Sequence, residues 1–268
     1  MVILQTHQIK SLVERLLGNR VWLEPSLELD SLEAFISELK PVNVGIPLVR
    51  IGSKQDGGYL VPDDLEGLKA CVSPGVSTEI GFDLEMAERG IPVYMADASV
   101  PGPPVDHDIF NFFPKFLDVF EDEKNMRLDT LCGLMPDAHR GDAILQMDIE
   151  GAEYRVLLDA SDDTLSQFRI ILLECHNLTR LFGRQNSQLI IATFRKLLRH
   201  FHVVHIHPNN VCPASQRGGI SIPPVMEFTF IRKDRVRSLS RDALTFPHPL
   251  DRDNMSNRPS LALPETWR

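Results

Sequence analysis

Residues 142–157 read DAILQMDIEGAEYRVL, and this stretch decides the fold. Its core, ILQM, lacks the alternation of polar and apolar residues, which is typical of a parallel strand buried on both faces. Further short apolar runs alternate with helix-like segments on either side, and that order predicts an α/β domain with a mainly parallel sheet. The expected strands are Lys69–Ser73, Pro92–Ala96, Ala143–Met147, Arg169–Glu174, Val203–His207 and Met226–Ile231, and the expected helices are Ile80–Arg89, Tyr154–Leu158 and Asn186–His200.

The flanking segments have other patterns. Residues 1–47 repeat apolar residues at three-to-four spacing, as at positions 12, 16 and 17, which predicts an N-terminal helical cap on a main domain of residues 48–268. Asp30 with Glu33 indicates a capping box at the start of a helix. We expect a loop or lid over residues 101–114, which are rich in proline and aromatic residues, and a turn-rich tail after residue 244 that wraps the surface.

Composition excludes several classes of protein. The 268 residues carry 28 Lys and Arg against 37 Asp and Glu, a formal charge of −9, which argues against sequence-independent nucleic-acid binding. No apolar run approaches the roughly 18 residues of a membrane span. The first residues lack the cationic region of a secretory signal, and the four cysteines are scattered, so we expect a cytoplasmic protein without a zinc site or a disulfide framework.

The segment from residue 71 to residue 97 has the layout of a nucleotide-binding crossover. Gly75 follows the first strand, and Asp97 ends the second strand, where it can accept hydrogen bonds from ribose hydroxyls. The layout serves NAD and S-adenosylmethionine alike. However, the G-x-G-x-x-G fingerprint is absent, and Glu79 at the helix N-terminus would repel a diphosphate while suiting a cationic sulfonium. The pattern favours S-adenosylmethionine and leaves NAD open.

A second group of polar residues follows two later strands. Asp148 ends one strand, and Glu174 and His176 end the next, where alternation puts both on one side of the chain. The carboxyl ends of parallel strands share one edge of a sheet, so the three side chains can bind a divalent cation such as magnesium or activate a hydroxyl, with His176 as the general base. We interpret Glu153 as a first-turn acid that the helix dipole favours.

Several of these segments resemble one known family. They read RIGSKQDGGYLVPDD (50–64), LQMDIEGAEYRVL (145–157), LLECHNL (172–178), VVHIHPNN (203–210) and FPHPLDRDN (246–254), and in this order they resemble FkbM-type S-adenosylmethionine-dependent methyltransferases. The D-I-E-G-A-E hexapeptide is the most specific element. The resemblance covers nearly the whole chain except the N-terminal cap.

The resemblance implies a Rossmann-like class I methyltransferase fold, with a mainly parallel seven-stranded sheet, flanking helices and a reversed terminal hairpin. It also implies O-methylation of a hydroxyl on a sugar or another small polar metabolite. The cofactor residues that it implies are Asp56, Gly57, Gly58, Tyr59, Gly75, Ser77, Thr78, Glu79 and Asp97, and we expect substrate contacts from Glu150, His207, Asn209 and Asn210. Ser77 stands where the family often has a second glycine. A NAD-type oxidoreductase and a non-catalytic cofactor-binding protein remain as alternatives, and a homodimer is a further possibility.

Overall fold

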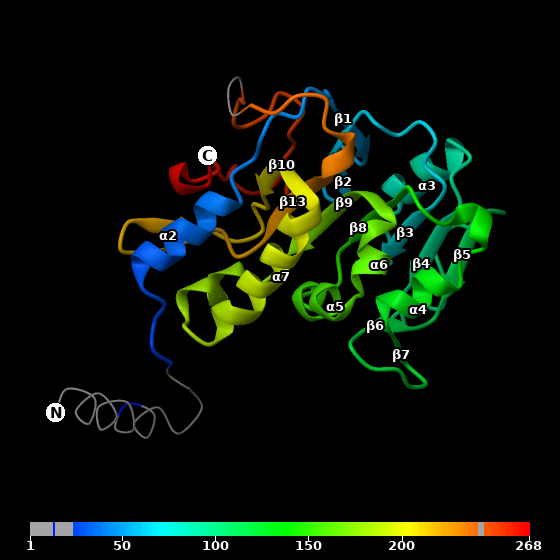
Figure 1. Cartoon of the computed structure of the whole chain (residues 1–268), viewed down its shortest axis with the longest axis horizontal. Coiled ribbons are helices and arrows are strands. Elements are labelled where there is room, and N and C mark those ends of the chain that lie inside the picture. The colour runs from blue at the N-terminus through cyan, green and yellow to red at the C-terminus, as the bar shows by residue number, and fades with distance from the viewer. Residues whose placement is uncertain (1–12, 14–23, 241–243) are drawn as a thin grey trace.

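The computed structural model describes residue 13, residues 24–240 and residues 244–268 (Figure 1). The predictions for residues 12, 16 and 17 therefore lie outside the described residues. The α-helices are α2 (Leu29–Glu38), α3 (Gly81–Glu88), α4 (Leu128–Gly133), α5 (Glu153–Asp159), α6 (Asp162–Ser166) and α7 (Asn186–His200). The strands are β1 (Leu48–Gly52), β2 (Gly58–Pro62), β3 (Cys71–Pro74), β4 (Val93–Ala96), β5 (Phe110–Phe113), β6 (Phe116–Leu117), β7 (Asn125–Met126), β8 (Ala143–Met147), β9 (Phe168–Cys175), β10 (Phe201–Pro208), β11 (Ser215–Arg217), β12 (Ile220–Ile222) and β13 (Met226–Arg232).

The main sheet has seven strands in the order β10-β13-β9-β8-β3-β4-β5. The neighbours from β9 to β5 pair in parallel, while β13 runs antiparallel to both β9 and β10. This architecture confirms the predicted mixed α/β fold with a mostly parallel seven-stranded sheet. The carboxyl ends of β3, β4, β8 and β9 consequently meet at one edge.

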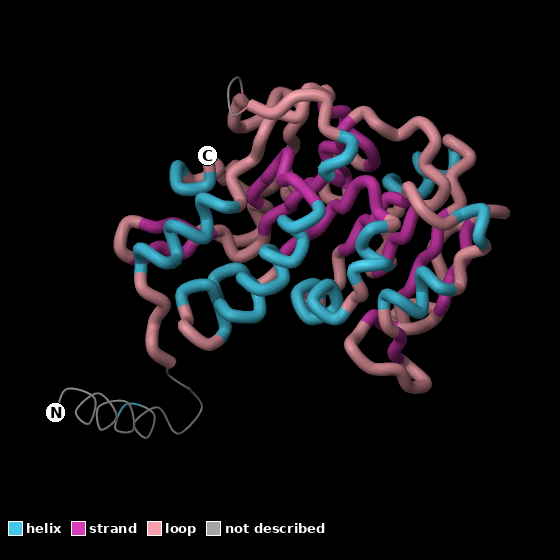
Figure 2. Tube along the Cα trace, in the orientation of Figure 1, coloured by secondary structure: helices cyan, strands magenta, loops and turns pink. Residues whose placement is uncertain are grey.

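The sheet is buried on both faces because its strands are almost wholly apolar. On β8, Leu145 packs into a core shared with α2, α5 and α7, whereas Ile144 packs into a second core beneath α3 and the β1–β2 hairpin. All residues of β8 and β9 are buried. Figure 2 shows the helices and the hairpin arranged around the strands. Buried central strands of this kind fix the positions of the residues that follow them.

The structure corrects the prediction for residues 101–114. The last part of this segment forms β5, which pairs with β4 at the edge of the sheet, so the expectation of a loop or lid is wrong there. The residues of β5 are only half-buried. An edge strand tolerates nearby prolines and weak apolar alternation, which is why the proline content was misleading. The six strands predicted from sequence are all present, with ends shifted by at most two residues.

Helix α2 packs against the main core together with the end of the chain. It begins at Leu29 with Glu28 as its N-cap and no capping side chain, so the capping box predicted at Asp30 is wrong and Asp30 lies in the first turn. Phe35 is buried in the core that contains Trp267. The indole Nε1 of Trp267 donates a hydrogen bond to the Ser221 carbonyl at 3.0 Å.

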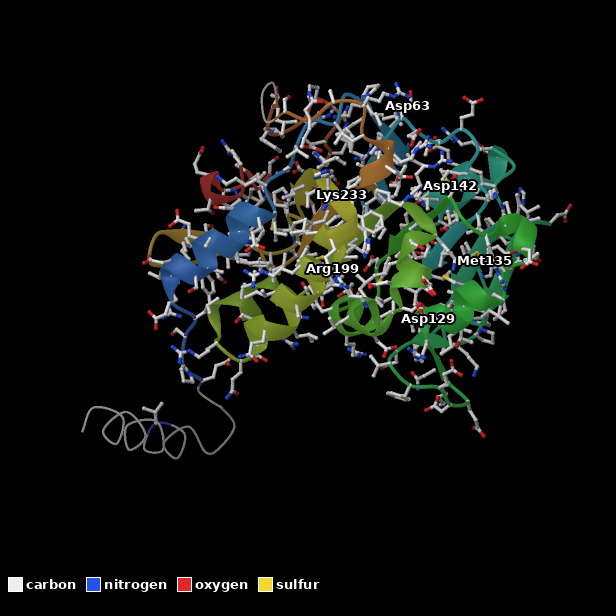
Figure 3. The ribbon with its side chains drawn as sticks, viewed as in Figure 1. Asp63, Asp129, Met135, Asp142, Arg199 and Lys233 are labelled. Atoms are coloured by element: carbon white, nitrogen blue, oxygen red, sulfur yellow. The ribbon has the colours of Figure 1, made fainter. Side chains whose placement is uncertain are left out.

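Charged side chains cover the outer surface of the helices and loops. Figure 3 labels examples at Asp63, Arg199 and Lys233, all of which are exposed. Within the described ranges, no helix is both long enough and apolar enough to cross a membrane.

Candidate active site

A cavity of about 450 Å³ opens at the carboxyl ends of β3, β4 and β8. Its volume falls within the roughly 300–1,000 Å³ of typical small-molecule sites. Of the residues predicted from sequence, it is lined by Gly75, Ser77, Asp97, Asp148 and Glu150. The structure thus brings part of the predicted cofactor set to the same cavity as part of the predicted acidic set.

Gly75 allows the first loop to lie directly against the end of β8. Its φ is +91°, and a Cβ at this position would lie 1.7 Å from the carbonyl oxygen of Asp148, so only glycine fits. Asp97 ties the end of β4 to this loop, because its Oδ2 accepts a hydrogen bond from Val76 N at 3.0 Å and its Oδ1 accepts from Ser99 N at 2.6 Å. Each carboxylate oxygen has a second lone pair and can accept one more donor from a ligand.

The opposite wall of the cavity was not predicted. It is formed by Phe116, Leu117, Asp118, Asn125 and Arg155. Arg155 donates two hydrogen bonds to the Asp118 carboxylate, at 2.8 and 3.0 Å. Strands β6 and β7 have two residues each, too short to leave a periodic pattern in the sequence. Exposed Phe116 offers an apolar surface of the kind that a nucleobase can pack against.

The DGGY segment, residues 56–59, does not line this cavity. A Cβ on Gly57 would come within 2.6 Å of Glu79 Cγ, so the segment packs against exposed Glu79 at the start of α3. Neither Glu79 nor the neighbouring Thr78 lines the cavity. The buried hydroxyl of Tyr59 accepts a hydrogen bond from Gln146 Nε2 at 3.1 Å. Burial raises the pKa of Tyr59 well above its usual value, and nearby Glu174 and Asp148 raise it further.

The structure brings Asp148, Glu174 and His176 together. One potential ligand atom from each lies within 4.8 Å of the others. His176 Nε2 is 3.9 Å from Asp148 Oδ1, 3.9 Å from Glu174 Oε1 and 3.4 Å from Glu150 Oε2. The Oδ1 atom of Asp148 is buried and has no hydrogen-bond partner among the described residues. The group has the donor atoms and the spacing of a divalent-cation site.

Burial and mutual repulsion raise the pKa values of these carboxyl groups. Burial raises the pKa of Asp148 to about 7; the charge of His176 opposes this, and Glu150 adds to it. The pKa of Glu174 is raised well above its usual range by burial first and then by Asp148. Near neutral pH the pair therefore retains a proton or takes up a cation in its place.

Glu153 occupies a position that the helix-dipole interpretation does not explain. It opens α5, yet it is fully buried, and its Oε1 lies 3.1 Å from His176 Nδ1. Burial alone would lower the pKa of His176, but the hydrogen bond and charge of Glu153, together with the charges of Asp148 and Glu150, outweigh it, and the net shift is upward. Only the acid-rich DIEGAE segment hinted at this contact, since nothing in the spacing pairs residues 153 and 176.

The predicted substrate residues separate into two groups. Glu150 lines the cavity, and Asn209 Nδ2 donates a hydrogen bond to Glu174 Oε1 at 2.9 Å. His207 and Asn210 lie beneath the C-terminal tail instead, where Asn210 Oδ1 accepts from Met255 N at 2.8 Å. His207 Nδ1 is 3.6 Å from an oxygen of Asp251 in the same tail.

A comparison with protein families matches the middle of the chain, including this edge of the sheet. Residues 86–216 match the family model of the methyltransferase FkbM domain. This part of the chain is similar to the FkbM methyltransferase family. The FkbM match includes Asp97, Asp148, Glu174 and His176, whereas the first glycine loop and the DGGY segment lie outside it. A comparison with curated proteins found no match.

Proposed function

We propose that this methyltransferase uses S-adenosylmethionine to methylate a hydroxyl group on a small polar acceptor, with a saccharide as the favoured class. The observation that carries the proposal is the cavity itself, which runs from Asp97 to Asp148 and Glu150. We also infer a Rossmann-like class I arrangement, which the adjacent parallel strands β4, β3 and β8 support. The FkbM match to a methyltransferase favours this function over the oxidoreductase alternative.

The cavity residues suit the cofactor in shape and charge. The bare backbone at Gly75 lets a ligand approach the loop closely, and Asp97 retains lone pairs for ribose hydroxyls. The carboxylates of Asp148 and Glu150 line the far part of the cavity, where they favour a positive charge. A bound S-adenosylmethionine would supply an activated methyl group on a sulfonium.

We propose His176 as the residue that takes a proton from an acceptor hydroxyl, because its Nε2 lies 3.4 Å from Glu150, which lines the cavity. A sugar hydroxyl is a poor nucleophile, and removal of its proton as the new C–O bond forms contributes roughly 10²–10⁴-fold to the rate. Nε2 of His176 faces the acidic group, while Nδ1 contacts Glu153. We assign Nε2 as the atom that receives the proton, with Asp148 and Glu174 orienting the acceptor.

A divalent cation is compatible with the same group. Asp148, Glu174 and His176 would hold it, and such an ion lowers the pKa of a bound hydroxyl. The two roles exclude each other at Nε2, since a neutral imidazole has one lone pair on that nitrogen. Either His176 accepts the proton directly, or it serves as a ligand.

A methyl-transfer assay tests this function. S-adenosylmethionine with a labelled methyl group is incubated with a panel of saccharides and other hydroxyl compounds. We expect label on an acceptor oxygen, a loss of at least about 100-fold in His176→Ala, and normal turnover in the control His200→Ala, which alters a half-exposed histidine at the end of α7. Near-normal turnover of His176→Ala removes it as the base. Binding of NAD in place of S-adenosylmethionine supports the oxidoreductase, and cofactor binding without any turnover supports a non-catalytic protein.

A further inference from the structure

Glu153 is buried in a way that calls for a specific partner. Its exposed fraction is 0%, and a buried carboxylate is costly unless hydrogen bonds compensate it. Its Oε1 accepts hydrogen bonds from Ile149 N at 3.2 Å and Gly151 N at 2.9 Å, and it contacts His176 Nδ1 at 3.1 Å. A first-turn acid that served only the helix dipole would not need the contact with the histidine.

The backbone before α5 is shaped to hold this carboxylate. Glu150 and Gly151 have φ values of +56° and +103°, a left-handed pair that turns the neighbouring amides toward Glu153 Oε1. A Cβ on Gly151 would lie 2.8 Å from Asn177 Nδ2, so this turn packs closely against the residue that follows His176. The turn therefore fixes Glu153 relative to the end of β9.

The next residue of α5 holds the same histidine by its backbone. The Tyr154 hydroxyl donates a hydrogen bond to the His176 carbonyl at 2.7 Å. Helix α5 thus holds His176 at two points: Glu153 contacts the ring and Tyr154 contacts the main chain. The contact with Tyr154 fixes the backbone of His176, and the contact with Glu153 orients its ring.

We propose that Glu153 is a positioning residue that keeps the proton of neutral His176 on Nδ1 and leaves the lone pair of Nε2 facing Asp148, Glu174 and Glu150. A carboxylate can only accept, and the contact of Nδ1 with Glu153 at 3.1 Å is shorter than the 3.4 Å between Nε2 and Glu150 Oε2, so the proton is favoured on Nδ1. The catalytic consequence rests on the proposed function. The tautomer itself does not, because it follows from the contact alone. Partners of this kind typically change activity by about 10–100-fold when they are removed.

The tautomer is measured by ¹⁵N NMR of the full chain labelled at its nine histidines, at a pH where His176 is neutral. The His176 signals are identified by their absence in His176→Asn. We expect protonated Nδ1 in the wild type and a mixed or Nε2-protonated ring in Glu153→Gln, whose amide can donate to Nδ1. The matched control Asp163→Asn removes an exposed first-turn acid from α6 and is expected to leave the tautomer unchanged.

Activity provides the second measurement. Glu153→Gln is expected to lower kcat by about 10–100-fold with little change in KM for the acceptor. Should Glu153→Gln fail to fold, Glu153→Asp withdraws the carboxylate by one methylene and is expected to give the same change of tautomer. An Nδ1-protonated His176 in every folded variant overturns the proposal. A changed tautomer without any methyl transfer in the wild type leaves the positioning role standing and overturns the proposed function instead.

Discussion

Gly75→Ala tests how closely the first loop must approach β8. The new Cβ would lie 1.7 Å from the Asp148 carbonyl oxygen, and Cβ contacts shorter than 3.0 Å essentially never occur, so loop and strand end must separate by about 1.3 Å. The positive φ of +91° adds a backbone penalty of about 1 kcal/mol relative to glycine. Because the clash is with backbone, we expect a total loss of about 3 kcal/mol or more.

Gly90→Ala is the matched control, since Gly90 also has a positive φ, +75°, but nothing within 4 Å of its Cβ position. Unfolding in urea measures both variants, and calorimetric titration measures their affinity for S-adenosylmethionine. We expect about 1 kcal/mol lost in Gly90→Ala with normal affinity, and a weaker affinity in folded Gly75→Ala, since the displaced loop lines the cavity. Equal stability losses and equal affinities in the two variants would refute the reasoning.

Three further predictions concern a buried acid, the end of the chain and the cation. Burial raises the pKa of Asp83 from 3.8 to about 7, so the folded state holds the proton more tightly than the unfolded state. The protonated carboxyl group therefore contributes its full stabilisation below about pH 4, and this contribution is lost as the pH rises through 7. Asp83→Asn should be more stable than the wild type at pH 8 by up to about 4 kcal/mol and show no gain at pH 4, whereas parallel pH profiles in urea unfolding contradict this. Trp267→Ala, at a fully buried side chain, should cost about 3–5 kcal/mol in the same assay, and a loss under about 1 kcal/mol would mean that the chain end does not dock. Mn²⁺ should bind the wild type but not Asp148→Asn or Glu174→Gln. Full activity after exhaustive chelation would show that catalysis does not need a cation.

The sequence predicted the structure best for strands that are buried on both faces of the sheet. Apolar runs such as residues 143–147 are typical of central strands, and parallel topology then brings the residues that follow them to one edge. This is why the sequence alone predicts that Asp148, Glu174 and His176 lie together, as they do in the structure. Strand β5 was missed because an edge strand is buried on fewer sides and its FNFF sequence follows a proline-rich segment.

The rest of the site depends on contacts that periodicity does not encode. The distance between Glu153 and His176 is set by two left-handed residues before α5, and no propensity predicts a non-glycine residue such as Glu150 there. The cavity wall at Phe116 and Arg155 joins segments that have no regular pattern. His207 and Asn210 were predicted as substrate residues, and the sequence did not indicate that both also contact the C-terminal tail.

A crystal structure with S-adenosylhomocysteine tests the central claim most directly. The account predicts that the ligand lies in the cavity at the ends of β3, β4 and β8, with its ribose hydroxyls on the Asp97 carboxylate and its sulfur toward Asp148 and His176. Asp97→Ala serves as the control and should show the cavity without ligand at the same concentration. Ligand bound elsewhere, or bound equally well without the Asp97 carboxylate, would contradict the account.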